Sequence, residues 1–145
     1  MNEKIFLYEK AEESPGFNLW LVSNVWQRKM NHGLKKFKLT HVQFVLLASL
    51  VYLLEKKEEV SQILLSNHAN TDIMMTSKVL RTLEKKRFVL RKKSKLDPRA
   101  KSIYITEEGY HITKKAIQEV ESIDKEFFSP IQVKKFNQDI KKLLS

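Results

Sequence analysis

The residues best suited to bind another molecule are cations gathered in one short segment. Between Lys78 and Lys101 the sequence holds eleven Lys and Arg residues but only two acidic residues, Glu84 and Asp97. This segment therefore carries nine of the ten net positive charges of the 145-residue chain. A diffuse excess of lysine is usually only a solvated surface, whereas a concentrated one indicates a polyanionic partner such as nucleic acid.

The residue patterns of common enzymes and metal sites are missing from the sequence. It contains no cysteine, which excludes disulfides, thiol redox sensing and cysteine-ligated zinc. It also lacks a glycine-rich phosphate loop, a His-Glu-x-x-His motif and a Gly-x-Ser-x-Gly motif. Glu107 and His111 stand four residues apart, which is more typical of a helix surface than of a metal site. We therefore expect a protein that is not an enzyme and holds no cofactor or metal.

The composition predicts one folded chain and no membrane partner. Hydrophobic residues make up 42% of the sequence, an ordinary fraction for a chain that buries a core. Charges interrupt the apolar runs well before the roughly 20 residues that a membrane-spanning helix needs. The first residues do not resemble a signal peptide, so we expect a cytoplasmic protein.

Helices must position the basic segment, because helical patterns dominate the chain. We expect helices over residues 17–36, 42–54 and 72–86 and from 107 onward, with a shorter one over 60–68. Thr40 and Gln43 form a capping box, and residues 42–54 are apolar at nearly every position, which predicts a buried core helix. Ser129 followed by Pro130 predicts the start of the last helix.

The helix predicted over 72–86 has an apolar side and a polar side. At about 100° per residue, the apolar side holds Ile73, Thr76, Val79, Leu80 and Leu83, and the opposite side holds Met74, Ser77, Lys78, Arg81 and Lys85. The preceding short helix and a tight turn, in which Asn70 or Thr71 is the expected cap, complete a helix-turn-helix. Two β-compatible runs, 88–93 and 102–105, flank a polar loop with a proline and predict a two-stranded wing.

This order of elements, together with three short motifs, resembles the MarR family (multiple antibiotic resistance regulators). The most specific motif is Asp97-x-Arg99 followed by Ile103-x-Ile105-Thr106-x-x-Gly109, which is similar to the family's Asp-x-Arg and Leu-Thr-x-x-Gly signature. The other two are Leu39-Thr40-x-x-Gln43-Phe44-x-x-Leu47, and Leu83-Glu84-Lys85-Lys86 with Val89-x-Arg91. The sequence departs from the family at Arg87, where glycine is usual, and at Met74 and Met75, where serine and threonine are common.

The resemblance implies a mainly α fold with a small antiparallel β wing (α+β). It places a winged helix-turn-helix over residues 39–106 and a helical dimerisation region over 17–38 and 107–145. The expected function is that of a homodimeric transcription regulator, a repressor, that reads a pseudo-palindromic site on double-stranded DNA. An alternative stays open, a winged-helix protein that binds nucleic acid, including RNA, without sequence specificity.

The resemblance also assigns roles to individual residues. Met74, Ser77, Lys78 and Arg81 are the candidates for the major groove. Arg99 is expected in the minor groove with Asp97 positioning it, and Lys92, Lys93, Lys95 and Lys101 are expected on phosphates. Many family members are released from DNA by a small aromatic ligand; the candidate pocket residues here are Trp20, Asn24, His41, Phe44 and Tyr52. Aromatic residues at helical spacing are more often part of the core.

Overall fold

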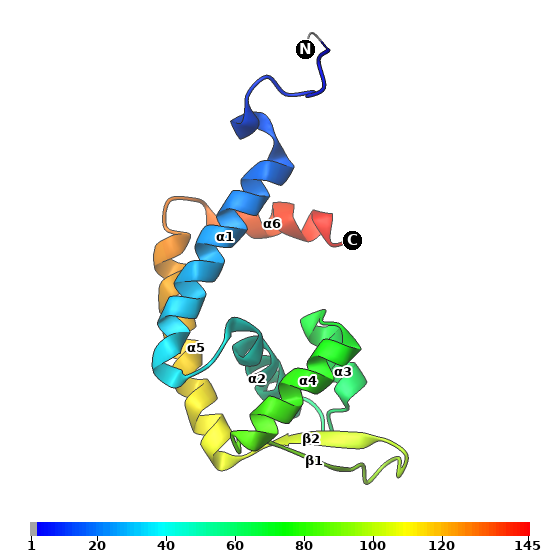
Figure 1. Cartoon of the computed structure of the whole chain (residues 1–145). Coiled ribbons are helices and arrows are strands. Elements are labelled where there is room, and N and C mark those ends of the chain that lie inside the picture. Colours follow the sequence, from blue (N-terminus) through cyan, green and yellow to red (C-terminus); the bar gives the residue numbers. More distant parts are fainter. Residues whose placement is uncertain (1–2) are drawn as a thin grey trace.

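Helices pack around one central helix, and a two-stranded hairpin projects from them (Figure 1). The computed structural model describes residues 3–145. The α-helices and strands in this range are α1 (Pro15–Leu34), α2 (His41–Leu54), α3 (Gln62–Ala69), α4 (Ile73–Lys85), β1 (Val89–Lys93), β2 (Lys101–Ile105), α5 (Glu107–Phe127) and α6 (Val133–Leu143). The predicted mainly α fold with a small antiparallel wing is confirmed.

The starts of α1 and α2 follow from local capping. The Ser14 hydroxyl accepts a hydrogen bond from the Phe17 backbone N–H at 3.2 Å, and Pro15 is the first helical residue, so α1 starts two residues before the predicted position. The predicted capping box of α2 is confirmed. Thr40 Oγ1 accepts from the Gln43 N–H at 3.3 Å, and Gln43 Oε1 accepts from the Thr40 N–H at 3.1 Å.

The last helix, α6, begins at Val133, so the start predicted from Ser129 and Pro130 is wrong. The Ser129 hydroxyl donates to the carbonyl of Glu126 at 2.7 Å, one turn back along α5. It therefore completes the end of α5, and residues 128–130 form a turn. Gln132 precedes α6 without a capping hydrogen bond from its side chain.

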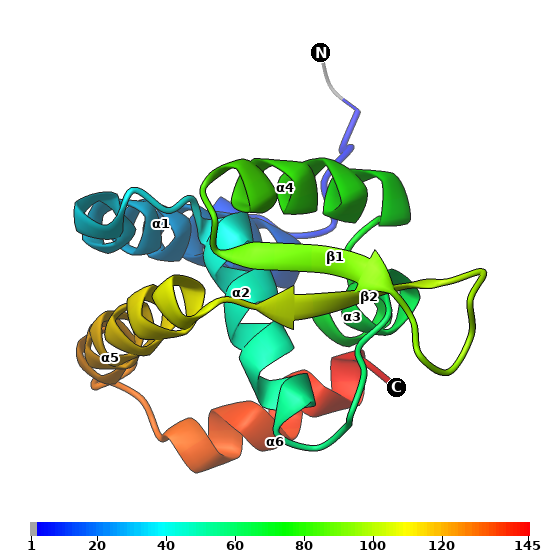
Figure 2. The same cartoon turned by 90° about the horizontal axis from the view of Figure 1, so that it is seen from below.

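The core is built around α2. Its residues Leu46, Leu47 and Leu50 are buried, and α2 contacts α1, α3, α4, α5 and β2. Figure 2 shows α2 crossing behind the sheet, with α1 and α5 on one side and α3 on the other. No single helix within residues 3–145 is long and apolar enough to cross a membrane. The segments 15–37 and 41–54 reach that length and composition only as a pair bent by 74°.

The outer helices α1 and α5 lie side by side and are joined by polar contacts (Figure 1). Trp26 Nε1 donates to Asp124 Oδ1 at 2.8 Å, and Lys36 Nζ lies 2.7 Å from Glu119 Oε2. Much apolar surface stays uncovered on α1 and around α6. The exposed large apolar residues there are Phe17, Leu19, Trp20, Leu21, Val22 and Val25 on α1, and Ile131, Val133, Leu143 and Leu144 at the C-terminal end.

The wing is an antiparallel hairpin that is joined to the helix-turn-helix. Val89 pairs with Ile105 at its base, and Lys93 pairs with Lys101 where the loop begins. The backbone N–H of Ile103 donates to the carbonyl of Val60 at 2.8 Å. The residues just before α3 therefore pair with β2 through a short antiparallel bridge between Ser61 and Ser102. The sequence patterns did not predict this third segment beside the hairpin.

Candidate nucleic-acid interface

The start of α4 is fixed by Asp72, whose Oδ1 accepts from the Met74 backbone N–H at 3.0 Å. The predicted caps, Asn70 and Thr71, have other roles. Asn70 adopts a left-handed conformation with φ 52° and ends α3, and the Thr71 hydroxyl lies 2.7 Å from that of Thr76. The tight turn of the helix-turn-helix is thus set by a left-handed residue, and the carboxylate of Asp72 meets the positive end of α4.

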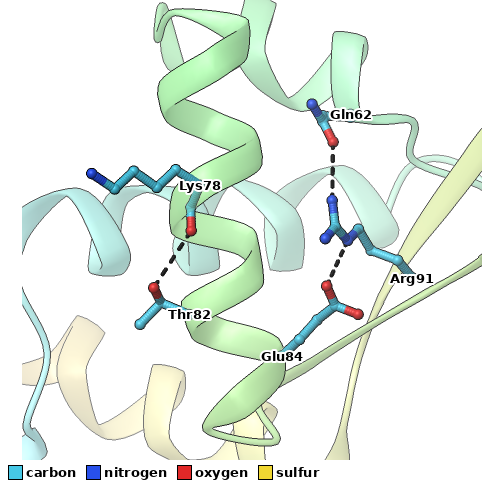
Figure 3. Close-up of polar contacts among 5 residues, drawn as sticks. All are labelled: Gln62, Lys78, Thr82, Glu84 and Arg91. Carbon is cyan, nitrogen blue, oxygen red and sulfur yellow. Dashed lines mark hydrogen bonds and ion pairs between the residues drawn. The ribbon is translucent and has the colours of Figure 1, made fainter.

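The two sides of α4 separate as the sequence predicts, except that Ile73, the first residue of the helix and expected on the apolar side, is 50% exposed. Thr76, Leu80 and Leu83 are buried, whereas the side chains of Met74, Lys78 and Arg81 are exposed and that of Ser77 is half-buried. In Figure 3, Lys78 extends from the side of α4 opposite to Gln62 and Arg91. Within residues 3–145, neither Lys78 nor Arg81 forms an ion pair, so both cations are free to meet a ligand.

Arg91 has a structural role within the basic segment. Its Nε lies 2.6 Å from Glu84 Oε1, and its Nη1 lies 3.5 Å from Gln62 Oε1 (Figure 3). The Arg91 side chain is only 15% exposed. This network joins α3, α4 and β1, and it uses one of the segment's two carboxylates to neutralise an internal cation.

The end of α4 is a left-handed turn at Arg87, where φ is 64°. The Arg87 N–H donates to the Glu84 carbonyl at 2.9 Å, and the Phe88 N–H donates to the Leu83 carbonyl at 3.0 Å. These two bonds form a Schellman motif, for which glycine is the usual residue because it has no Cβ. Arg87 therefore takes the conformation usual for glycine and bears its steric cost.

The next turn explains the Thr-x-x-Gly motif in physical terms. Thr106 Oγ1 accepts from the Gly109 N–H at 2.9 Å, which caps α5, and donates to the Arg87 carbonyl at 2.7 Å. Gly109 lies against the backbone of Phe88, and a Cβ at this position would overlap the Phe88 carbonyl. The motif thus packs the start of α5 directly onto the turn that ends α4.

The wing tip presents Arg99 to solvent. Asp97 Oδ1 accepts from the Arg99 backbone N–H at 3.0 Å, and the described residues contain no ion pair between these two side chains. The remaining predicted wing cations are also exposed: Lys92, Lys93, Lys95 and Lys101. The wing therefore carries a row of cations that are available to a polyanion, with Arg99 at its tip.

Glu59, which the sequence analysis did not single out, holds the wing loop. Its carboxylate accepts from Ser94 Oγ at 2.5 Å, from the Lys95 backbone N–H at 2.7 Å and from the Tyr104 hydroxyl at 3.4 Å. The hydrogen bond from Ser94, followed by that from Lys95, lowers the pKa of Glu59 below its ordinary value. In the sequence Glu59 belongs to a charged run at the end of a helix, and no local signal relates it to the wing.

The five candidate ligand-pocket residues lie on α1 and α2 but not around one point. His41 Nδ1 lies 2.7 Å from Gln27 Oε1, and Phe44 belongs to the core. Tyr52 stacks on His68 with ring centroids 5.3 Å apart, about 16 Å along α2 from His41. Asn24 is half-buried and Trp20 is 64% exposed. A shared pocket at these residues stays a prediction.

A separate groove of about 670 Å³ runs between α1 and α5. Its walls combine apolar and charged residues: Val25, Arg28, Lys29, His32, Gly33, Glu119, Ile123, Glu126 and Phe127.

Glu107 and His111, four residues apart, are the pair considered as metal ligands. His111 Nε2 lies 3.8 Å from Glu107 Oε1, and both side chains are exposed. Among residues 3–145 no three His, Cys, Asp or Glu side chains gather as metal ligands would.

The helices α3 and α4 followed by the hairpin define a winged helix-turn-helix protein. A model of the MarR family matches residues 39–101. The uncharacterized HTH-type transcriptional regulator YdcH of Bacillus subtilis is 47% identical over 116 residues, which cover 80% of this chain and 79% of YdcH. The chain therefore belongs to the MarR family of transcription regulators.

Several solved structures share the fold of this chain. CouR from Rhodococcus jostii, bound to p-coumaroyl-CoA, aligns with a TM-score of 0.82 at 24% identity, covering 94% of this chain and 93% of CouR. A mutant MarR from E. coli complexed with operator DNA aligns with a TM-score of 0.83 at 22% identity, covering 99% and 100%. The DNA complex of S. aureus MepR gives 0.83 at 18% identity, covering 93% and 97%. At these identities the likeness concerns the fold.

Proposed function

We propose that this chain forms a homodimer that binds a pseudo-palindromic site on duplex DNA and represses transcription there. The protein would act in the cytoplasm and carry no catalytic activity. The observation that supports this most is the division of α4, which buries Thr76, Leu80 and Leu83 and leaves Met74, Lys78 and Arg81 free on the opposite side. A helix of this kind fits the major groove, where all four base pairs can be distinguished.

Each part of the interface would then have its own task. Met74, Ser77, Lys78 and Arg81 would face base edges and nearby phosphates in the major groove. Arg99 would enter the adjacent minor groove, and the four wing lysines would contact phosphates, which contribute affinity but little sequence preference. Met74 suits a thymine methyl group, because its thioether side chain is apolar and 80% exposed.

The dimer would form through the helices outside the winged unit. The α6 helix has no buried residue within the single chain, although Val133, Phe136 and Ile140 recur on one face. Exposed apolar surface also runs along α1. Such surface is typical of a protein–protein interface, and a second copy of the chain with the same exposed faces would bury it by two-fold symmetry.

A small ligand would release the dimer from DNA. The groove between α1 and α5 supports this part of the proposal, because it is large enough for a small organic molecule and combines apolar walls with Arg28 and Lys29. CouR, a protein of the same fold, was crystallised with p-coumaroyl-CoA. Aromatic acids and their coenzyme A thioesters are therefore the compounds to test for release of bound DNA.

The test is selection of the purified protein against a pool of random DNA duplexes at near-physiological salt. We expect enrichment of a pseudo-palindrome whose half-sites are about one helical turn apart. Binding that depends strongly on salt, with no enriched sequence, would contradict the proposal. That result would favour the alternative, a winged-helix protein that binds nucleic acid by charge alone. An enriched duplex placed over a promoter in a transcription assay then distinguishes repression from activation.

A further inference from the structure

The loop at the wing tip is organised around the hydroxyl group of Ser94. This oxygen accepts hydrogen bonds from the backbone N–H groups of Leu96 and Asp97, both at 3.0 Å. A serine hydroxyl has a single proton, and here it donates that proton to Glu59 Oε2 at 2.5 Å. The two backbone bonds form the turn, and the bond to Glu59 ties that turn to another part of the fold.

The second oxygen of Glu59 holds the next residue of the loop. Glu59 Oε1 accepts from the Lys95 backbone N–H at 2.7 Å. Glu59 belongs to the connection between α2 and α3, ahead of the helix-turn-helix, and is 35 residues from Ser94 in the sequence. The wing loop is therefore joined directly to the unit that carries α4, in addition to its own two strands.

The same loop continues to Arg99 through a short chain of backbone contacts. The Ala100 N–H donates to the Asp97 carbonyl at 3.0 Å, and the Ser94 N–H donates to the Ala100 carbonyl at 3.0 Å, which closes the loop. Asp97 Oδ1 in turn holds the Arg99 N–H. A shift of the loop at Ser94 would thus move the residue that we expect in the minor groove.

We propose that Glu59 is a positioning residue that fixes the wing tip, and with it Arg99, at a set distance from the recognition helix α4. This inference rests on the proposed function, because it concerns two DNA contacts made by separate elements. Holding both contacting groups in place before binding lowers the free energy spent on ordering them in the complex. Glu59 would act in this way without touching DNA.

The sign of the expected effect separates this role from simple electrostatics. Glu59 is a negative charge next to a row of wing lysines, so its charge alone opposes the binding of a polyanion. Neutralising it would strengthen binding to any duplex if charge were its only contribution. A positioning role predicts the opposite result for the specific site, namely a loss of affinity despite the more favourable net charge.

The experiment compares Glu59→Gln with Glu58→Gln, a control that removes the same charge from an adjacent exposed residue with no hydrogen bond or ion pair among the described residues. Affinity is measured by fluorescence anisotropy for the duplex enriched by selection and for an unrelated duplex of equal length, at one salt concentration. We expect Glu59→Gln to lower the affinity for the enriched duplex about tenfold and not for the unrelated one. Glu58→Gln should weaken neither.

Two further measurements test whether the effect passes through Arg99. In an Arg99→Ala background, Glu59→Gln should cause no further loss of specific affinity, because the positioned group is absent. In the free protein, hydrogen exchange at the Lys95, Leu96 and Asp97 amides should become faster in Glu59→Gln and in Ser94→Ala. Ser94→Ala leaves the surface of the helix-turn-helix untouched, which keeps the test valid if Glu59→Gln folds poorly.

The outcomes distinguish this inference from the proposed function. If the wild-type protein enriches no DNA sequence, the proposed function fails and the positioning role fails with it. If the wild-type protein does select a sequence and Glu59→Gln binds it with unchanged or greater affinity, only the inference is overturned. Additive losses in the double variant Glu59→Gln, Arg99→Ala would also overturn it.

Discussion

Asp97 holds the backbone of Arg99 and not its guanidinium group: Asp97 Oδ1 accepts from the Arg99 N–H at 3.0 Å. This contact shapes the turn at the wing tip and leaves the charged end of Arg99 exposed. The acidic residue in the Asp-x-Arg motif can therefore position the arginine without neutralising it. An ion pair between the two side chains would have competed with a phosphate or a base edge for the same donors.

The role of this contact in DNA binding can be tested by replacing Asp97 and Arg99 one at a time. We expect Arg99→Ala to weaken binding to the enriched duplex by about 1–3 kcal/mol, because one groove contact is lost while the fold stays intact. Asp97→Ala should also weaken binding, whereas Asp97→Asn keeps an acceptor oxygen for the Arg99 N–H and should bind nearly as well as wild type. Anisotropy titrations measure all three. Equal losses for Asp97→Ala and Asp97→Asn would show that the charge of Asp97 matters and its hydrogen bond does not.

The left-handed residue at the end of α4 offers a stabilising substitution. Replacing Arg87 with glycine relieves the steric cost of φ 64° and should raise the free energy of unfolding by about 0.5–1 kcal/mol, after the greater freedom of glycine in the unfolded chain is subtracted. Arg87→Ala is the matched control, because it removes the same side chain but keeps a Cβ. Urea unfolding at one fixed protein concentration measures both, and equal stability of the two variants would refute the argument.

The ring of His41 lies where α1, α2 and α5 meet, beside Gln27, Trp26 and Asp124. Burial lowers the pKa of His41 below its ordinary value of 6.5, and the nearby carboxylate of Asp124 partly opposes this shift. The folded state thus favours the neutral imidazole, whose Nδ1 lies 2.7 Å from Gln27 Oε1, and Trp26 packs edge-on against the ring. The contribution of neutral His41 to the free energy of unfolding is therefore complete above pH 6.5. This contribution decreases as the pH falls from 6.5 towards the lower pKa of His41 in the folded state.

Thermal unfolding across this pH range tests the assignment to His41. We expect the melting temperature to fall between about pH 7.5 and 5.5, and this fall should be smaller in His41→Gln. His68→Gln is the control, because His68 lies on α3 and stacks on Tyr52, near the end of α2 far from His41. The same pH dependence in wild type and His41→Gln would assign the effect to other groups.

Dimer formation can be tested on α6, which buries none of its residues within one chain. A charge at Ile140 should disrupt the dimer, because it would be transferred into an apolar interface, so we expect Ile140→Asp, and likewise Phe136→Asp, to be monomeric. Gln138→Asp adds the same charge on the opposite side of α6 and should stay dimeric. Light scattering at matched concentrations gives the mass, and a dimeric Ile140→Asp would exclude this face as the interface.

The features that sequence predicted well are those encoded by neighbouring residues. The capping box of Thr40 and Gln43, the two sides of α4 and the two strands of the wing depend on local periodicity and local hydrogen bonds. Serine followed by proline was less reliable. At Ser14 and Pro15 the pair starts α1. At Ser129 the hydroxyl instead donates back to the carbonyl of Glu126, because α5 ends only two residues earlier, at Phe127.

The contacts that sequence did not reveal join residues far apart in the chain. Glu59 lies 35 residues from Ser94, and Gln62 lies 29 residues from Arg91. No periodicity in the sequence marks Glu59 or Arg91 as internal. In a charged run, glutamate and arginine are both typical surface residues. Arg91 therefore counted as one more cation of the basic segment until the structure placed it between Glu84 and Gln62.

The internal placement of Arg91 affects how many counterions leave the DNA when the protein binds. Each phosphate that a protein cation neutralises releases condensed counterions, so a plot of log K against log salt has a slope of about −0.9 per contact. Arg91 is paired with Glu84, and Lys86 Nζ donates to the Lys38 carbonyl at 2.6 Å, so two of the eleven cations between Lys78 and Lys101 are held by the protein itself. The measured slope should consequently be shallower than the cation count of the segment implies, and replacing Lys86 should leave it unchanged while replacing Lys93 reduces it.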